Sequence, residues 1–222
     1  MLSPDVVRAV EKIAIYIVPA MLGFILHEVA HGYAAARLGD PTARLMGRLS
    51  INPLPHIDPA GLIVFVLTSL SGSFVFGWAK PVPVDPRYFA HPRKGMMIVA
   101  LAGPLTNFLL ALFFTALLYL SLEIVPATFW NAHPQSLLVL KAMSAGVFIN
   151  LGLGWLNLLP IPPLDGSKIA AYFLPENLAF SYLRIQRYGF LVLIVLLISG
   201  VLDSILTPLI HGSSQMLLSF LR

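Results

Sequence analysis

The chain has no cysteine among its 222 residues. Disulfide bonds and thiolate metal sites are therefore excluded, and any metal ion must be held by histidine, aspartate or glutamate. Charged residues are also scarce: they make up 11% of the chain, whereas a soluble globular domain carries about 25%. The basic residues are dispersed between apolar segments, so the net charge of +4 does not indicate nucleic-acid binding.

Apolar residues are correspondingly abundant in the sequence. They make up 58% of the sequence, and the mean hydropathy is +0.84. Several apolar runs approach 20 residues, about the length that crosses a bilayer as a helix. The sequence predicts an all-α membrane protein with about four to six transmembrane helices. It forms a single membrane-embedded domain over 1–222, with a core at 13–170 and a C-terminal helix region at 188–222.

The first apolar run, residues 13–38, contains His27 and His31 with Glu28 directly after the first histidine. On a helix, positions four apart share a face, so both imidazoles can reach one metal ion. Glu28 projects from the flank, near enough to act on a water at the metal. This is the His-Glu-x-x-His arrangement of zinc peptidases. It predicts an intramembrane-cleaving zinc metalloendopeptidase with one zinc ion; the alternative is that the two histidines only form hydrogen bonds to other helices.

A third metal ligand is needed, because a catalytic zinc site typically has three protein ligands. Asp165 ends a proline-rich segment in which the chain cannot stay helical. Irregular backbone at membrane depth is tolerated only where protein buries it or where it lines a wet cavity, and an ionisable residue there is a functional candidate. Asp165 is therefore the candidate third ligand, unless it only caps the helix that starts near Gly166.

The distribution of basic residues predicts the topology. Loops 37–58, 80–94 and 165–187 carry lysine or arginine, whereas loop 123–135 has neither. The positive-inside rule places the three basic loops in the cytoplasm. We expect a multi-pass protein of the cell membrane whose active site lies within the bilayer and opens toward the cytoplasmic side.

Residues 62–79 are ambiguous, since they are apolar enough to span and also fit two short strands with a turn. A single crossing here would place the metal ligands on opposite sides of the membrane. We therefore expect a re-entrant β-hairpin at 62–79. This arrangement puts the N-terminus outside, although Arg8 and Lys12 favour the opposite orientation. The last span is expected at about 188–210.

Three motifs in order along the chain resemble those of one protease family: His27-Glu28-x-x-His31, Ala102-Gly103-Pro104-x-x-Asn107 and Asn157-x-x-Pro160-x-x-Pro163-Leu164-Asp165-Gly166. The family is the site-2 proteases, which are intramembrane zinc metalloproteases, and the similarity is to its compact bacterial and archaeal branch without PDZ or CBS domains. The resemblance implies that His27, His31 and Asp165 bind zinc and that Glu28 is the catalytic base. It also implies that Asn157 holds the substrate backbone; the alternative is that Asn157 only forms a hydrogen bond between helices.

Several other residues are interpreted from the sequence as structural rather than catalytic. Asn107 and the Gly103-Pro104 pair are interpreted as structural. His56 is interpreted as loop structure, with a place at the mouth of the cleft as the alternative.

Two other functions remain to be weighed. A membrane transporter could use buried His, Glu and Asp side chains as an ion or proton relay, but it predicts ionisable residues spread over several spans and inverted repeats. If the protein were an inactive scaffold, one or more of the expected metal ligands should be missing from the sequence. Here the ionisable residues gather in one helix and one loop, no repeat is found, and the ligand set is intact. The expected partners are a transmembrane protein or peptide substrate and the lipid bilayer, and no nucleic acid.

Overall fold

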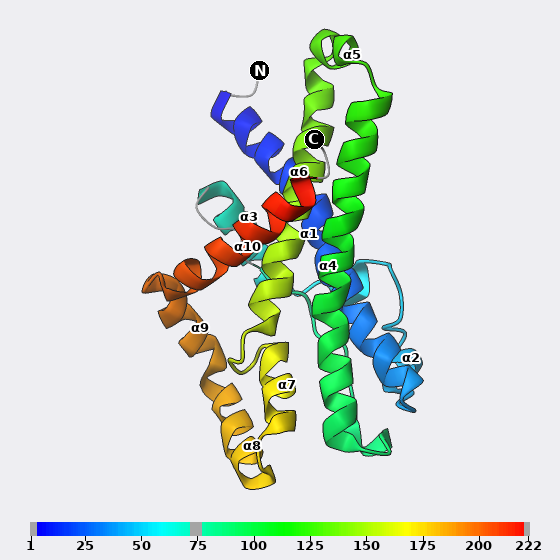
Figure 1. The fold of residues 1–222 in the computed structure, drawn as a ribbon, viewed down its shortest axis with the longest axis vertical. Coiled ribbons are helices and arrows are strands. Elements are labelled where there is room, and N and C mark those ends of the chain that lie inside the picture. The colour runs from blue at the N-terminus through cyan, green and yellow to red at the C-terminus, as the bar shows by residue number, and fades with distance from the viewer. Residues whose placement is uncertain (1–3, 72–76, 220–222) are drawn as a thin grey trace.

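Every regular element of residues 4–71 and 77–219, the part of the chain that the computed structural model describes, is helical (Figure 1). The elements are α1 (Pro4–Arg37), α2 (Thr42–Leu45), η1 (Leu54–His56), α3 (Pro59–Ser71), η2 (Pro86–Tyr88), α4 (Pro92–Ile124), α5 (Ala127–Ala132), η3 (Pro134–Ser136), α6 (Leu137–Leu158), α7 (Asp165–Phe173), α8 (Glu176–Leu183), η4 (Arg184–Tyr188), α9 (Gly189–Ile198) and α10 (Val201–Ser219).

Within the described part of the chain, four helical segments are long and apolar enough to cross a membrane. They are Val10–Arg37, Pro92–Ile124, Pro134–Leu158 and Glu176–Ile198. The prediction of an all-α, multi-pass membrane protein is confirmed.

The centre of the fold is the antiparallel pair α4 and α6, which α1 crosses and contacts on both (Figure 1). Glycines of α6 allow the close approach, because a Cβ on Gly146 would lie 2.5 Å from the Phe114 ring and one on Gly154 would lie 2.9 Å from Phe108. The core between the two helices is built from apolar side chains of both: Ala111, Phe114, Val147 and Leu151.

The β-hairpin predicted at 62–79 is wrong for its first half, because residues 59–71 form helix α3. The Asp58 side chain accepts a hydrogen bond from the Gly61 N–H (2.9 Å) and so caps the start of this helix. The run at 62–67 is uniformly apolar and gives no alternating strand face. The turn of the predicted hairpin, at 72–76, lies outside the described residues, and residues 77–79 form neither helix nor strand.

The chain nevertheless returns to the loop from which α3 started. With 13 residues, α3 is about 20 Å long and too short for a hydrocarbon core of about 30 Å. Residues 77–85, which we call the returning segment, pack back against α3, since a Cβ on Gly77 would lie 2.7 Å from the Phe65 Cβ. The Lys80 N–H then donates to the His56 carbonyl (2.8 Å). Both ends of this excursion therefore lie on one side of the fold.

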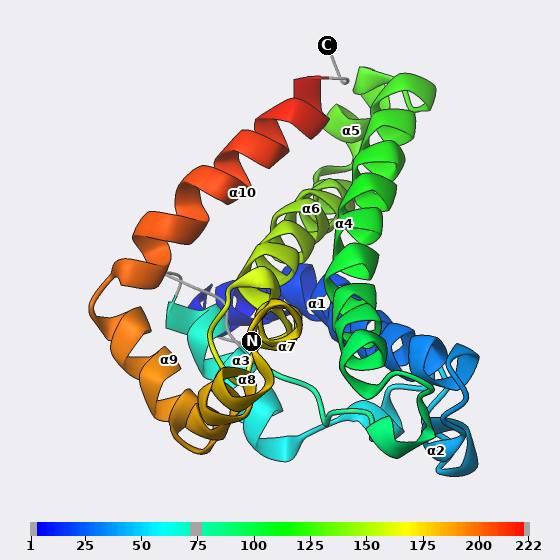
Figure 2. The ribbon, with the colours of Figure 1, turned by 60° about the horizontal axis from the view of Figure 1, so that its bottom comes forward.

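The last predicted span, 188–210, is also wrong, because the chain bends between α9 and α10. Gly200 has a φ of +74°, a left-handed conformation that favours glycine and ends the helix. Helix α10 then leads back toward the α5 end of the molecule, as Figure 2 shows. It packs on α6, where the Trp155 indole N–H donates to the Ser213 hydroxyl (3.1 Å).

Candidate metal centre

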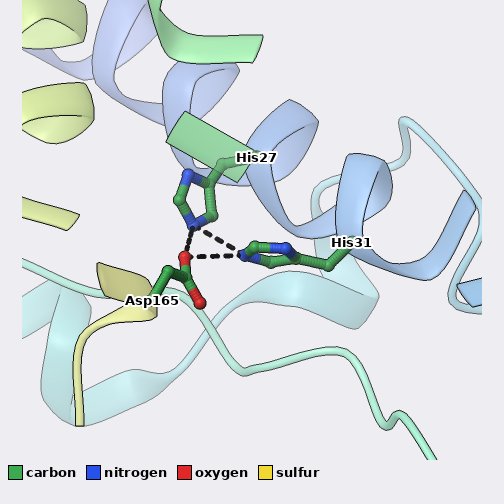
Figure 3. A group of neighbouring side chains, drawn as sticks. All are labelled: His27, His31 and Asp165. Carbon is green, nitrogen blue, oxygen red and sulfur yellow. Dashed lines mark hydrogen bonds and ion pairs between the residues drawn. The ribbon is translucent and has the colours of Figure 1, made fainter. Parts of the chain in front are cut away.

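His27 and His31 lie one turn apart on the buried face of α1, and their rings converge on Asp165 (Figure 3). Their Nε2 atoms are 2.9 Å apart, and their ring centroids are separated by 4.5 Å. Helical periodicity alone produces this juxtaposition, as the spacing in the sequence predicted.

Asp165 completes a triangle of donor atoms with the two histidines. Its Oδ2 lies 3.1 Å from the His27 Nε2 and 3.0 Å from the His31 Nε2 (Figure 3). Asp165 is the first residue of α7, but the cap position belongs to Leu164, and no side-chain capping bond is made. The carboxylate therefore points at the histidines rather than at the helix terminus. Its other oxygen, Oδ1, accepts a bond from the Lys168 ammonium (3.0 Å).

The second nitrogen of each imidazole faces a hydrogen-bond acceptor. The His31 Nδ1 lies 2.7 Å from the Val99 carbonyl, and the His27 Nδ1 lies 2.6 Å from the Asn107 Oδ1. Each Nδ1 therefore carries a hydrogen, and an imidazole in this tautomer presents a lone pair at its Nε2. Two lone-pair nitrogens and a carboxylate oxygen thus face one another. Such a cluster of acceptors calls for a cation at its centre.

The spacing and chemistry of this triangle fit zinc. Ligand atoms about 2.0 Å from a tetrahedral zinc lie about 3.3 Å apart, and the three separations here are 2.9, 3.0 and 3.1 Å. Imidazole nitrogen with carboxylate oxygen is a donor set that zinc accepts. The Lys168 ammonium, 3.0 Å from the Asp165 Oδ1, favours the ionised carboxylate, so Asp165 offers an anionic oxygen to the cluster.

Gly103 of α4 forms the surface on which both rings rest. A Cβ at this position would lie 2.5 Å from the His31 Cε1 and 2.6 Å from the His27 Nε2. The sequence alone suggested a structural role for the Gly103-Pro104 pair. The structure places this glycine directly against both imidazole rings, which fits a structural role.

Glu28 lies beside the cluster and is not part of it; within the described residues the cluster contains only His27, His31 and Asp165. The Glu28 Oε2 accepts a hydrogen bond from the Val82 N–H in the returning segment (2.6 Å). Gly32, one turn further along α1, makes room for this contact, since a Cβ there would lie 2.9 Å from a Val82 methyl carbon. The returning segment therefore lies against the helix face that carries the motif.

The other predicted residues lie outside the triangle. The Asn157 amide, near the end of α6, donates to the Leu153 carbonyl of its own helix (3.0 Å). His56 is almost fully buried, and its Nε2 donates to the Ser50 carbonyl (2.9 Å), which fits loop structure.

Sequence reasoning missed Asn150, a fully buried residue of α6 whose Oδ1 accepts from the Asn107 Nδ2 (3.1 Å). The one available signal was an amide within an otherwise apolar run. That signal does not say what the amide contacts.

Comparisons with known proteins agree with this chemistry. The model of peptidase family M50 matches residues 124–200, which include Asp165. Three relatives carry the description "Putative zinc metalloprotease". YwhC of Bacillus subtilis (strain 168) is 33% identical over 210 residues, covering 91% of this chain and 88% of its own length. Rip2 of Mycolicibacterium smegmatis is 28% identical over 208 residues, covering 91% of this chain and 74% of its own. MJ0611 of Methanocaldococcus jannaschii is 32% identical over 147 residues, covering 66% of this chain and 64% of its own. No solved structure gives a significant match.

Proposed function

Because the chain belongs to peptidase family M50, we infer that it is an intramembrane zinc metalloprotease that hydrolyses peptide bonds of membrane proteins. We propose His27, His31 and Asp165 as the zinc ligands and Glu28 as the catalytic base. The observation that carries this assignment is the convergence of three acceptor atoms within 3.1 Å of one another. The transporter alternative gains no support, since the ionisable groups gather at one centre and the relatives are described as proteases.

The reaction requires an activated water and a proton transfer. Bound zinc lowers the pKa of a water to about 7 and polarises a carbonyl group. Glu28 takes the proton of the attacking water and passes it to the leaving amine. The Val82 N–H holds the Glu28 Oε2, and the second carboxylate oxygen remains to accept the proton.

The substrate must expose its peptide bond, because a transmembrane helix bonds its backbone groups internally. We propose that Asn157 hydrogen-bonds the unwound backbone. Its amide bonds only a carbonyl of its own helix among the described residues, so it can turn toward a substrate. An apolar cavity of about 220 Å³ lies between α3, α6, α9 and α10 and could receive apolar substrate side chains; its walls include Val64, Leu156, Phe190 and Leu202.

We propose that the site opens to the cytoplasm of the cell and that residues 1–222 act as one membrane domain. The three basic loops come together: the Asp85 N–H donates to the Asp40 Oδ2 (2.7 Å), and the Arg93 guanidinium donates to the Ala171 carbonyl (2.7 Å). Helix α5, in the loop without lysine or arginine, lies at the opposite end of α4 (Figure 1). The positive-inside rule then assigns the basic end to the cytoplasm.

The proposal is tested with the purified protein in detergent. The wild-type protein should bind one zinc ion and cleave a model transmembrane substrate. Glu28→Gln should keep the zinc but lower the cleavage rate by about 10² to 10⁴, the usual contribution of a general base. Normal cleavage by this variant would refute the role of Glu28. For topology, a reporter fused after Lys80 should report the cytoplasm, and an external signal would overturn the orientation.

A further inference from the structure

The two histidines differ in what fixes their tautomer. The His31 Nδ1 faces the backbone carbonyl of Val99, which can only accept a hydrogen bond. That nitrogen therefore carries the hydrogen under all circumstances. The His27 Nδ1 faces the side-chain amide of Asn107, and an amide presents either an oxygen acceptor or an NH₂ donor depending on its rotation. The His27 tautomer is therefore defined only if the Asn107 amide is itself fixed.

A second amide fixes the first. The Asn107 Nδ2 donates to the Asn150 Oδ1 (3.1 Å) and to the Gly23 carbonyl (3.2 Å). The Asn150 Nδ2 in turn donates to the Gly146 carbonyl of its own helix (2.9 Å). Carbonyl oxygens can only accept, so this sequence of bonds has a single consistent direction. It runs from Gly146 through both amides and ends with the Asn107 Oδ1 against His27.

Both asparagines are fully buried, so water does not offer them alternative partners. They come from different transmembrane helices, Asn107 from α4 and Asn150 from α6, and they meet at α1. Gly23 of α1 permits the meeting, because a Cβ there would lie 2.8 Å from the Asn150 Oδ1. The amide pair thus links three helices at the back of the metal centre.

We propose that Asn107 and Asn150 are positioning residues that hold His27 with its Nε2 lone pair directed at zinc. Asn107 acts on His27 directly, and Asn150 acts only through Asn107, by forbidding the rotated amide. A rotated Asn107 would place its oxygen against two acceptors, the Gly23 carbonyl and the Asn150 Oδ1, and its NH₂ group against His27. The imidazole would then carry its hydrogen on Nε2 and could not bind the metal. The inference rests on the proposed zinc site.

The test measures the zinc dissociation constant by chelator competition on the purified protein. Asn107→Leu should raise the dissociation constant about ten- to a hundredfold, the usual effect of losing a partner of a metal-bound histidine. Asn150→Leu should raise it less, by up to about tenfold, because the Gly23 carbonyl still opposes rotation. Asn150→Asp keeps an acceptor oxygen for Asn107 and should stay near the wild-type value. Thr115→Val is the control, since Thr115 is a buried α4 residue whose hydroxyl donates to the Ala111 carbonyl and to no other group of residues 4–71 and 77–219.

A double-mutant cycle separates positioning from packing. If Asn150 acts through Asn107, the double variant Asn107→Leu/Asn150→Leu should bind zinc no more weakly than Asn107→Leu alone. Additive losses would overturn the relay, as would wild-type affinity in Asn107→Leu. Should Asn107→Leu fail to fold, the proposal is tested by comparing the zinc dissociation constants of Asn150→Leu and Asn150→Asp. Equal values for these two variants would overturn the proposal. A wild-type protein without zinc would instead refute the metal site itself.

Discussion

Gly103→Ala should weaken zinc binding without altering any ligand. The added Cβ would lie 2.5 Å from the His31 Cε1 and 2.6 Å from the His27 Nε2. Carbon atoms in favourable contact are about 3.5 to 4.0 Å apart, so the rings must retreat by about 1 Å. Metal–ligand distances tolerate only about 0.2 Å. The displaced rings therefore cannot keep their positions around the metal.

The size of the effect follows from overpacking energies. Inserting a methyl group into a packed site costs about 1 to 3 kcal/mol. The metal-free protein can relieve the clash by moving the imidazoles, so the cost falls mainly on the zinc-bound form. At about 1.4 kcal/mol per factor of ten, the zinc dissociation constant should rise about 5- to 150-fold.

The assay is chelator competition combined with thermal unfolding of the metal-free protein. The matched control is Gly152→Ala on α6, where the nearest atom to an added Cβ is 3.6 Å away, an ordinary contact. This control should bind zinc as the wild type does. The reasoning would be refuted if Gly103→Ala kept the wild-type dissociation constant, because the rings could not then rest on Gly103.

Two further substitutions test the returning segment. Val82→Pro removes the N–H that holds Glu28; since a hydrogen bond to a charged group contributes about 1.5 to 3 kcal/mol, kcat should fall at least about tenfold with the zinc content unchanged. Burial alone would raise the pKa of the Asp40 carboxyl, but the bonds from Thr42 and from the Asp85 N–H hold that pKa below its usual range. The ionised Asp40 carboxylate therefore stabilises the fold above its unfolded-state pKa, and this stabilisation is lost as the pH falls through its folded-state pKa. Asp40→Ala should lower the free energy of unfolding by about 2 kcal/mol at neutral pH. It should also expose the returning segment to trypsin.

Each of these has its own control. Val84→Pro alters the same segment at a residue whose N–H has no hydrogen-bond partner within the described ranges, and it should keep the wild-type kcat. Equal kcat values for Val82→Pro and the wild type would show that the base needs no anchor. For Asp40, the melting temperature of the wild type should fall more steeply below about pH 4 than that of Asp40→Ala. Parallel acid profiles would place the acid sensitivity elsewhere.

The pattern of the sequence determined much of the centre. The absence of cysteine and the scarcity of ionisable residues in apolar segments left few possible ligands. Helical periodicity dictated that His27 and His31 share a face, and the proline-rich segment singled out Asp165. The structure brings these three residues together. Local rules were sufficient here because each rests on covalent geometry or on composition.

Only the tertiary structure decided the rest. The first half of 62–79 is helical because a cap at Asp58 and packing against Gly77 outweigh the strand preference of its β-branched and aromatic residues. The roles of Gly103 and Asn107 depend on α4 lying against α1, and that of Asn150 depends on α6 joining them. The sequence by itself determined the chemical groups and their spacing along one helix. The packing of helices distant in sequence decided which nitrogen of His27 bonds the Asn107 amide, because a hydrogen bond depends on both partners and not on one residue alone.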